Sequence, residues 1–191
     1  MINHEDCTEK TDEELVKLSL GNPDHFSCLT RRYESKLLHY IMRISKFRRE
    51  DASDILQDVF VKTYYNLNDF NSDLKFSSWV YRIAHNQTVS EIRKKSVRLT
   101  VPFEKEDIDR FEDAFDVSKE VDNSLDREMI DRALSKLDEK YREVLVLRFL
   151  DEKDYVEIAD ILKKPVSTVG NLILRGKVLF KAEYDKLIRK N

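Results

Sequence analysis

The sequence predicts an all-α protein built from two small helical domains that are joined by an acidic linker. Apolar residues recur at helical spacing along most of the 191 residues. No segment shows the alternation of apolar and polar residues that is typical of a half-buried strand. One long acidic stretch interrupts the helical pattern. The expected boundaries are 1–97 for the first domain, 98–124 for the linker and 125–191 for the second domain, which contains a helix-turn-helix.

The N-terminal half is expected to consist of short helices separated by breaking residues. Gly21 followed by Pro23 is a strong stop, because glycine readily ends a helix and proline cannot continue one. Together with the apolar spacing, such breaks predict helices at about 11–20, 23–32, 34–47, 51–67 and 74–95.

The acidic stretch lies between the two helical parts. Residues 102–116, PFEKEDIDRFEDAFD, contain seven acidic and two basic side chains and no sustained apolar stripe. Such a segment buries too little apolar surface to offset the entropy lost on ordering it. We therefore expect a linker that tethers the two domains.

The composition excludes several functional classes. The chain is 41% hydrophobic and 37% charged with a net charge of −3, so a nucleic-acid partner would have to bind where positive charge is locally segregated. Three glycines are too few for the loops that cradle phosphates in P-loop or dinucleotide-binding proteins. No catalytic constellation emerges, and we expect no enzymatic activity, no cofactor and no metal.

The cysteines and the apolar runs bear on the location of the protein. Cys7 and Cys28 are too few for a disulfide framework, which favours a reducing cytoplasm, and Cys28 is expected to be a core thiol. His25 and Cys28 lack the further ligands that structural zinc requires. No run approaches the roughly 18 apolar residues of a membrane span, and the start lacks the order of a signal peptide. A cytoplasmic protein without membrane insertion is expected.

The segment VEIADILKKPVSTVGNLILRGK, residues 156–177, has the form of a helix, a tight turn and a second helix. Asp154 and Glu157 have capping-box spacing at its start. Pro165 suits the beginning of the second helix, because its missing N–H would have been unpaired there anyway. At Lys163 a glycine would relieve left-handed strain of about 1–2 kcal/mol.

One side of the second helix carries polar and basic side chains that can reach base edges and phosphates in a major groove. We call this side the recognition face, and its candidate DNA-binding residues are Ser167, Thr168, Asn171 and Arg175. Lys177, in the basic tail that follows, is a further candidate, which could add a phosphate contact. Leu174 and Val178 share the recognition face. A plain helical hairpin with a solvated polar face explains this stretch alone equally well.

The helix expected at 51–67 is amphipathic in an unusual way. Its core-facing stripe consists of Ala52, Ile55, Leu56, Val59 and Thr63. On the opposite side, which we call the docking face, acidic and amide side chains surround an apolar residue: Asp54, Gln57, Asp58 and Val61. Tyr65 extends it. This combination indicates a docking surface for a basic helical partner, although ordinary amphipathic helices also expose single apolar residues.

The helix expected at 74–95 is predicted to bury Phe76, Val80, Ile83 and Ala84. The other side, which we call the strand-binding face, carries Trp79, Arg82, Asn86, Arg93 and Lys94. Cations beside an aromatic ring, with an amide to read a base edge, are the parts of a single-strand site, where stacking one base is worth about 1–3 kcal/mol. The alternative is that Trp79 belongs to the core and the cations are solvated.

Four segments together resemble one family. DASDILQDVFVKTYYNL, FSSWVYRIAHN, LDEKYREVLVLRFL and YVEIADILKKPVSTV occur in the order and spacing of bacterial RNA polymerase sigma factors of the sigma-70 family. The resemblance is closest to the extracytoplasmic-function (ECF) group, which keeps regions two and four. It implies a protein that binds core RNA polymerase and directs promoter recognition and transcription initiation.

The resemblance also implies roles for the three faces. The docking face would bind the clamp helices of the polymerase β′ subunit. The strand-binding face, with the loop at 69–75, would melt the −10 element of promoter DNA and hold a flipped base. The recognition face would read the −35 element, in a domain that meets the β flap. The acidic linker would thread the active-site cleft and RNA exit channel, and an anti-sigma factor is implied as an inhibitor.

A stand-alone helix-turn-helix transcriptional regulator is the alternative function. The docking face distinguishes the two, because a stand-alone regulator needs no surface for the polymerase clamp.

Overall fold

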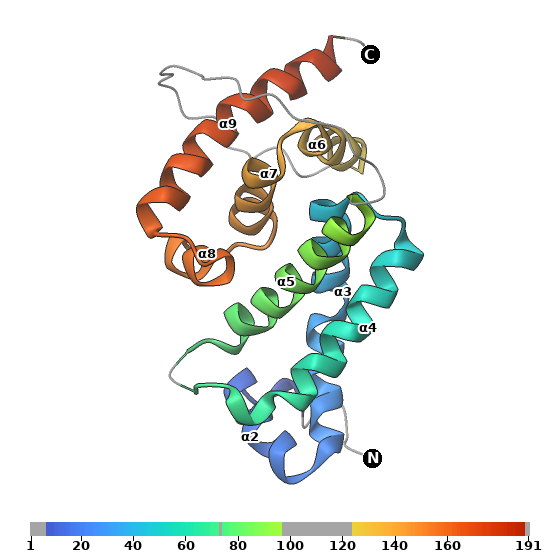
Figure 1. The fold of residues 1–191 in the computed structure, drawn as a ribbon, viewed down its shortest axis with the longest axis vertical. Helices are drawn as coiled ribbons and strands as arrows, with labels where there is room; N and C mark the ends of the chain where they lie inside the picture. The colour runs from blue at the N-terminus through green and yellow to red at the C-terminus, as the bar shows by residue number, and fades with distance from the viewer. Residues whose placement is uncertain (1–6, 73, 97–123, 190–191) are drawn as a thin grey trace. The chain divides into compact units, whose positions relative to one another are not determined.

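The computed structural model describes residues 7–72, 74–96 and 124–189, and within them every regular element is a helix (Figure 1). The predicted all-α class is confirmed. The elements are α2 (Asp12–Gly21), η1 (Pro23–His25), α3 (Phe26–Ser45), α4 (Arg49–Tyr65), η2 (Leu67–Asp69), α5 (Phe76–Ser96), α6 (Ser124–Lys136), α7 (Glu139–Leu145), η4 (Val146–Leu150), α8 (Tyr155–Leu162) and α9 (Val166–Ile188). They form two compact units. The first contains α2, α3, α4 and α5 up to Glu91, together with Asp160–Leu162 of α8, and the second contains the end of α5, the rest of α8, and α6, α7 and α9. Positions 98–123 of the predicted linker lie outside the described residues.

In the first unit, α3, α4 and α5 lie side by side (Figure 1). Tyr40 of α3 packs on Tyr81 of α5 with ring centroids 5.1 Å apart, and its hydroxyl lies 3.1 Å from His85 Nδ1. The predicted stripe of α4 is buried as expected: Ala52, Ile55, Leu56, Val59 and Thr63. This packing fixes the outward directions of both α4 and α5.

The break predicted after residue 32 is wrong, because α3 runs without interruption over Phe26–Ser45. That span contains neither glycine nor proline, and Tyr33, at the predicted break, is buried in the core. Helix propensity and the buried stripe therefore continue through this position.

Helix α2 is fastened to the rest of the first unit by polar contacts. Asp12 accepts from the Tyr33 hydroxyl and forms an ion pair with Arg32. Burial, reinforced by the hydrogen bond to Asp12, raises the pKa of Tyr33 well above its usual range. Glu13 Oε1 accepts from the backbone N–H of Phe76 at 3.0 Å, which supports the first turn of α5. The N-terminal helix thus braces the beginning of α5.

Cys7 and Cys28 form a disulfide, with their Cα atoms 5.3 Å apart. The expectation that Cys28 is a free core thiol is therefore wrong. The chain before α2 folds back onto α3, where Arg32 Nη2 donates to the carbonyl of Cys7 at 2.6 Å and to that of Lys10 at 3.0 Å. This folding back of the chain brings the two sulfur atoms together. Because the two cysteines are paired, their number no longer argues for a reducing compartment.

In the second unit, α9 packs against α6 and α7. A Cβ at Gly176 would lie 3.2 Å from Cγ of Leu145, so glycine permits the close approach of α9 to α7. The buried side of α9 is Val169, Ile173, Gly176, Phe180 and Tyr184, whereas Val166 at its first turn is exposed. Among the described helices, none is long and apolar enough to cross a membrane.

The helix-turn-helix is formed by α8 and α9. The predicted capping box is present, since Asp154 Oδ1 accepts from Glu157 N and Glu157 Oε2 accepts from Asp154 N, both at 2.8 Å. Lys163 ends α8 in the left-handed region, at φ 51° and ψ 46°. A non-glycine residue thus carries the predicted strain, and Pro165 directly precedes α9.

Candidate polymerase and nucleic-acid interfaces

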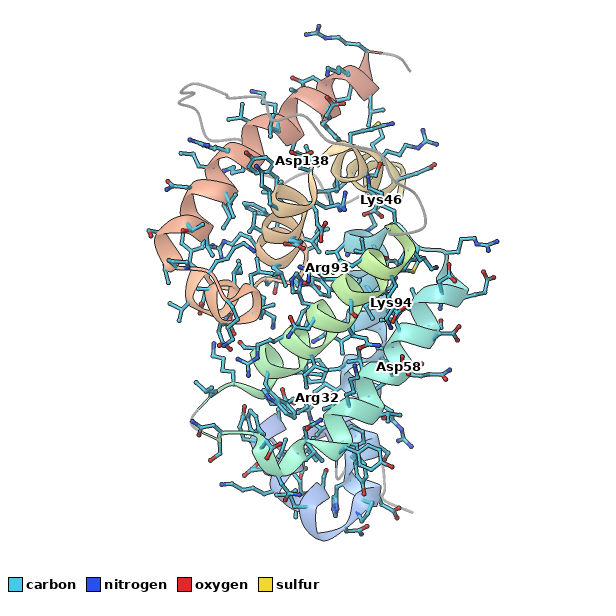
Figure 2. All side chains as sticks on the ribbon, in the orientation of Figure 1. Arg32, Lys46, Asp58, Arg93, Lys94 and Asp138 are labelled. Carbon is cyan, nitrogen blue, oxygen red and sulfur yellow. A yellow bond between two sulfur atoms is a disulfide. The ribbon has the colours of Figure 1, made fainter. Side chains whose placement is uncertain are left out.

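The docking face lies on the outward side of α4. Asp54, Gln57 and Asp58 are all exposed, and Figure 2 shows Asp58 on this helix. Val61 is 54% exposed and Tyr65 is 77% exposed, so apolar surface lies in water next to the carboxylates of α4. Such a strip suits a partner that offers both cations and an apolar ridge.

A pocket of about 490 Å³ opens between α4 and α5 in the first unit. Described residues from both helices and from η2 line it: Lys62, Asn66, Asp69, Trp79, Ile83, Asn86, Gln87 and Ser90. It therefore combines an aromatic ring, an aliphatic side chain, amides, one cation and one carboxylate. A flipped base needs a flat apolar surface on which to stack and polar groups that bind its edge, and this lining offers both.

Trp79 belongs both to the core and to the pocket. It is only 8% exposed because it packs on Phe70 and Phe76, with ring centroids 5.3 Å and 5.8 Å apart. The remaining accessible part of the indole lines the pocket. Trp79 is thus a core residue, as the alternative held, and part of its indole remains open to the pocket. Its contact with a DNA strand stays a prediction.

The other residues of the strand-binding face follow along α5. Asn86 is exposed at the pocket. Arg93, seven residues on, shares its side of the helix about 10 Å further along, and Lys94 is its neighbour in the last turn (Figure 2). Arg82 is partly exposed on the same helix but lies outside the described pocket lining. The pocket and the cations are therefore arranged in line.

The recognition face lies at the beginning and outer side of α9. Ser167, Thr168, Asn171 and Arg175 are all exposed, and they lie opposite the buried side of the helix. Leu174 is 53% exposed among them. Lys177 is different, because it is partly buried and its Nζ lies 5.7 Å from the ring centroid of Phe149. It stands at the edge of the face, and its contact with a phosphate stays a prediction.

Helix α7, which packs against α9, carries a buried arginine next to a buried glutamate. Arg142 and Glu143 are 6% and 4% exposed, and Arg142 Nη1 donates to the carbonyl of Leu137 at 3.0 Å. Burial lowers the pKa of Arg142. Burial, together with the nearby charge of Glu139, raises the pKa of Glu143 from 4.5 to about 7. The support of α9 thus contains a carboxyl that titrates near neutral pH.

Four residues of the described pocket lining were not predicted from the sequence: Lys62, Asn66, Gln87 and Ser90. Lys62 and Gln87 are the two that contact each other. Both lie on helices whose other residues attracted attention, but neither belongs to a face defined by spacing alone. Lys62 Nζ donates to Gln87 Oε1, which is a contact between positions 25 residues apart. A sequence without tertiary contacts carries no signal for such a pair.

Comparisons with known proteins decide the family. The family model described as Sigma-70 region 2 matches residues 29–98, and the model described as Sigma-70, region 4 matches residues 127–179. The ECF RNA polymerase sigma factor SigW of Bacillus subtilis (strain 168) is 34% identical over 176 residues, covering 85% of this chain and 90% of SigW. The chain belongs to the ECF RNA polymerase sigma factors. The ECF sigma-E factor of Escherichia coli (strain K12) is also similar, at 30% identity over 94% of this chain and 97% of its own.

Solved structures share the fold of this ECF sigma factor. The structure of CnrH in complex with the cytosolic domain of CnrY aligns with a TM-score of 0.70 at 24% identity, over 93% of this chain and 99% of that chain. The sigma factor RpoE, in complex with the anti-sigma factor NepR from Bartonella quintana, aligns with a TM-score of 0.67 at 20% identity, over 84% and 96%. The predicted function as a sigma factor is confirmed, and the stand-alone regulator is not retained.

Proposed function

We propose that this ECF sigma factor contacts its polymerase and its promoter through the three faces defined above. The docking face binds the β′ clamp helices, and the strand-binding face with its pocket melts the −10 element and holds a flipped non-template base. The recognition face reads the −35 element. In this proposal the chain acts in the cytoplasm as a specificity subunit and catalyses nothing by itself, because polymerisation belongs to the core enzyme.

One observation carries the proposal for the first unit. The exposed acidic and apolar side chains of α4 and the pocket between α4 and α5 belong to the same packed pair of helices. A polymerase that binds the docking face therefore holds the pocket at a fixed distance from its own DNA path. This arrangement suits a protein that acts on DNA only when docked.

We further propose the division into 1–97, 98–124 and 125–191, with the middle segment as an acidic linker through the active-site cleft and RNA exit channel. Within it, residues 102–116 carry seven acidic residues against two basic ones, which suits a path built for nucleic acid. The second domain would meet the β flap. An anti-sigma factor is a further proposed partner, supported by the complex of RpoE with NepR among proteins of this fold.

Native gel shifts with promoter DNA test the proposal. The free chain should bind duplex promoter weakly, and a tight complex should form once core polymerase is added. Asp54→Lys should weaken association with core polymerase about tenfold or more, because reversing a charge at an interface costs several kcal/mol.

Glu34→Lys is the matched control, since Glu34 is an exposed carboxylate on α3 outside the docking face. It should associate as the parent chain does, and circular dichroism should show unchanged helicity for both variants. Strong sequence-specific binding by the chain alone, or equal losses for Asp54→Lys and Glu34→Lys, would count against the proposal.

A further inference from the structure

Lys62 and Gln87 are joined in a hydrogen-bonded bridge that ends at the docking face. Lys62 Nζ donates to Gln87 Oε1, and Gln87 Nε2 donates to Asp58 Oδ2 at 3.0 Å. The orientation of the Gln87 amide follows from its partners, because an ammonium only donates and a carboxylate only accepts. Asp58 and Lys62 lie one turn apart on α4, and Gln87 reaches them from α5.

The bridge fixes a side chain that is otherwise free to move. Lysine has a long flexible stem with many rotamers, whereas Gln87 is 7% exposed and held on both sides. A nearly buried amide with two partners has a defined position, because breaking either hydrogen bond would leave a polar group unsatisfied. The ammonium of Lys62 is therefore held in place at the pocket before any ligand arrives.

We propose that Lys62 binds a backbone phosphate of the single strand that enters the pocket, and that Gln87 is its positioning residue. The inference rests on the proposed role of the pocket in holding a flipped base. Lys62 is the one cation among the eight described residues that line the pocket, and its side chain is exposed. An ammonium has three N–H donors, of which Gln87 uses one, so two can bind phosphate oxygens.

The position of Lys62 favours a phosphate over a base edge. The apolar part of the pocket lining is the nearly buried Trp79, at 8% exposure, and the partly exposed Ile83, which suit the flat faces of a base. Lys62, in the last turn of α4, is by contrast an exposed residue of the lining. A base that enters the pocket leaves its sugar and phosphate outside, near this ammonium.

The salt dependence of DNA binding tests the assignment. We would assemble the chain with core polymerase and measure the affinity for a promoter fragment with a pre-opened −10 segment at several salt concentrations. Loss of one single-strand phosphate contact lowers the slope of log K against log salt by about 0.7. Lys62→Met should show this decrease, and Lys62→Arg should retain the parent slope.

Lys17→Met is the matched control, since Lys17 is an exposed cation of α2 outside the described pocket lining. It removes the same charge from the same unit and should leave the slope unchanged. Gln87→Leu, which keeps the bulk but breaks the bridge, should lower the slope partly. The double variant of Lys62→Met with Gln87→Leu should be no worse than Lys62→Met alone.

The outcomes separate this inference from the proposed function. If the parent complex does not bind the opened fragment, the proposed function fails. If the parent binds and Lys62→Met keeps the same slope, or instead changes the preferred base without changing the slope, the phosphate assignment is overturned while the function stands. Fully additive effects of Lys62→Met and Gln87→Leu would overturn the positioning role. A role in folding alone would lower the thermal midpoint and leave the slope unchanged.

Discussion

Phe70 and Trp79 pack with ring centroids 5.3 Å apart, and this contact joins the segment before α5 to the pocket. Replacing Trp79 by alanine would therefore remove core packing worth about 3–5 kcal/mol as well as a stacking surface. Asn86 lies on the same side of α5 and is exposed, so its amide can be removed without disturbing that packing.

Asn86→Ala should impair melting of the −10 element more than polymerase binding. Loss of one polar contact to an extruded base costs about 1–3 kcal/mol, which corresponds to about 5- to 150-fold fewer open complexes. Permanganate footprinting of −10 thymines measures the loss, while association with core polymerase should remain that of the parent. Asn171→Ala, the same substitution on α9, should leave unchanged the fraction of bound promoter that is melted at the −10 element. Equal permanganate reactivity for Asn86→Ala and the parent would remove Asn86 from the site.

Arg175→Ala on the recognition face should weaken the response to the −35 element. A good contact between a side chain and a base edge provides about 1–3 kcal/mol of discrimination. We expect less transcription from a promoter with its native −35 element. On a template whose −35 element is scrambled, Arg175→Ala and the parent should perform alike. A uniform decrease on both templates would instead indicate a phosphate contact or a folding defect.

Reduction of the Cys7–Cys28 disulfide should destabilise the first unit. The two residues are separated by 21 positions, and closing a loop of that size stabilises a fold by about 3 kcal/mol in the chain-entropy description. Thermal unfolding with and without a thiol reductant measures the difference. The double variant Cys7→Ser with Cys28→Ser should unfold at the same temperature under both conditions. Two freely titratable thiols in the folded, air-oxidised protein would contradict the pairing.

The stability of the second unit should depend on the ionisation of Glu143. Its pKa is about 7 in the folded chain and near 4.5 when unfolded, so the folded state binds the proton more tightly. The stabilisation from this group is complete below about pH 4.5 and is lost as the pH rises through 7. As the pH rises from 4 to 8, the free energy of unfolding of Glu143→Gln should therefore increase by about 1–3 kcal/mol relative to that of the parent.

Denaturant unfolding at several pH values measures that gain. Glu139→Gln is the companion variant, because it removes the neighbouring charge that helps to raise the pKa of Glu143. It should show a smaller pH dependence than the parent. A constant difference between Glu143→Gln and the parent across this range would show that Glu143 ionises normally.

Helical periodicity was sufficient to predict the two sides of α4, because burial of its stripe follows directly from a 3.6-residue repeat. The capping box of Asp154 and Glu157 and the left-handed conformation of Lys163 depend only on residues a few positions away in the sequence. Both were predicted, and both are confirmed. The Cys7–Cys28 pair and the bridge from Lys62 through Gln87 to Asp58 depend on where distant segments meet. The sequence pattern of either partner alone is compatible with a solvated or a buried position, so these contacts could not be predicted.

Run-off transcription with purified core polymerase on promoter-bearing genomic fragments tests the central claim most directly. Core polymerase should produce discrete transcripts when this chain is added, and these should be lost with Asp54→Lys and retained with Glu34→Lys. Transcription that is the same with and without the chain would contradict the assignment of its faces to polymerase and promoter.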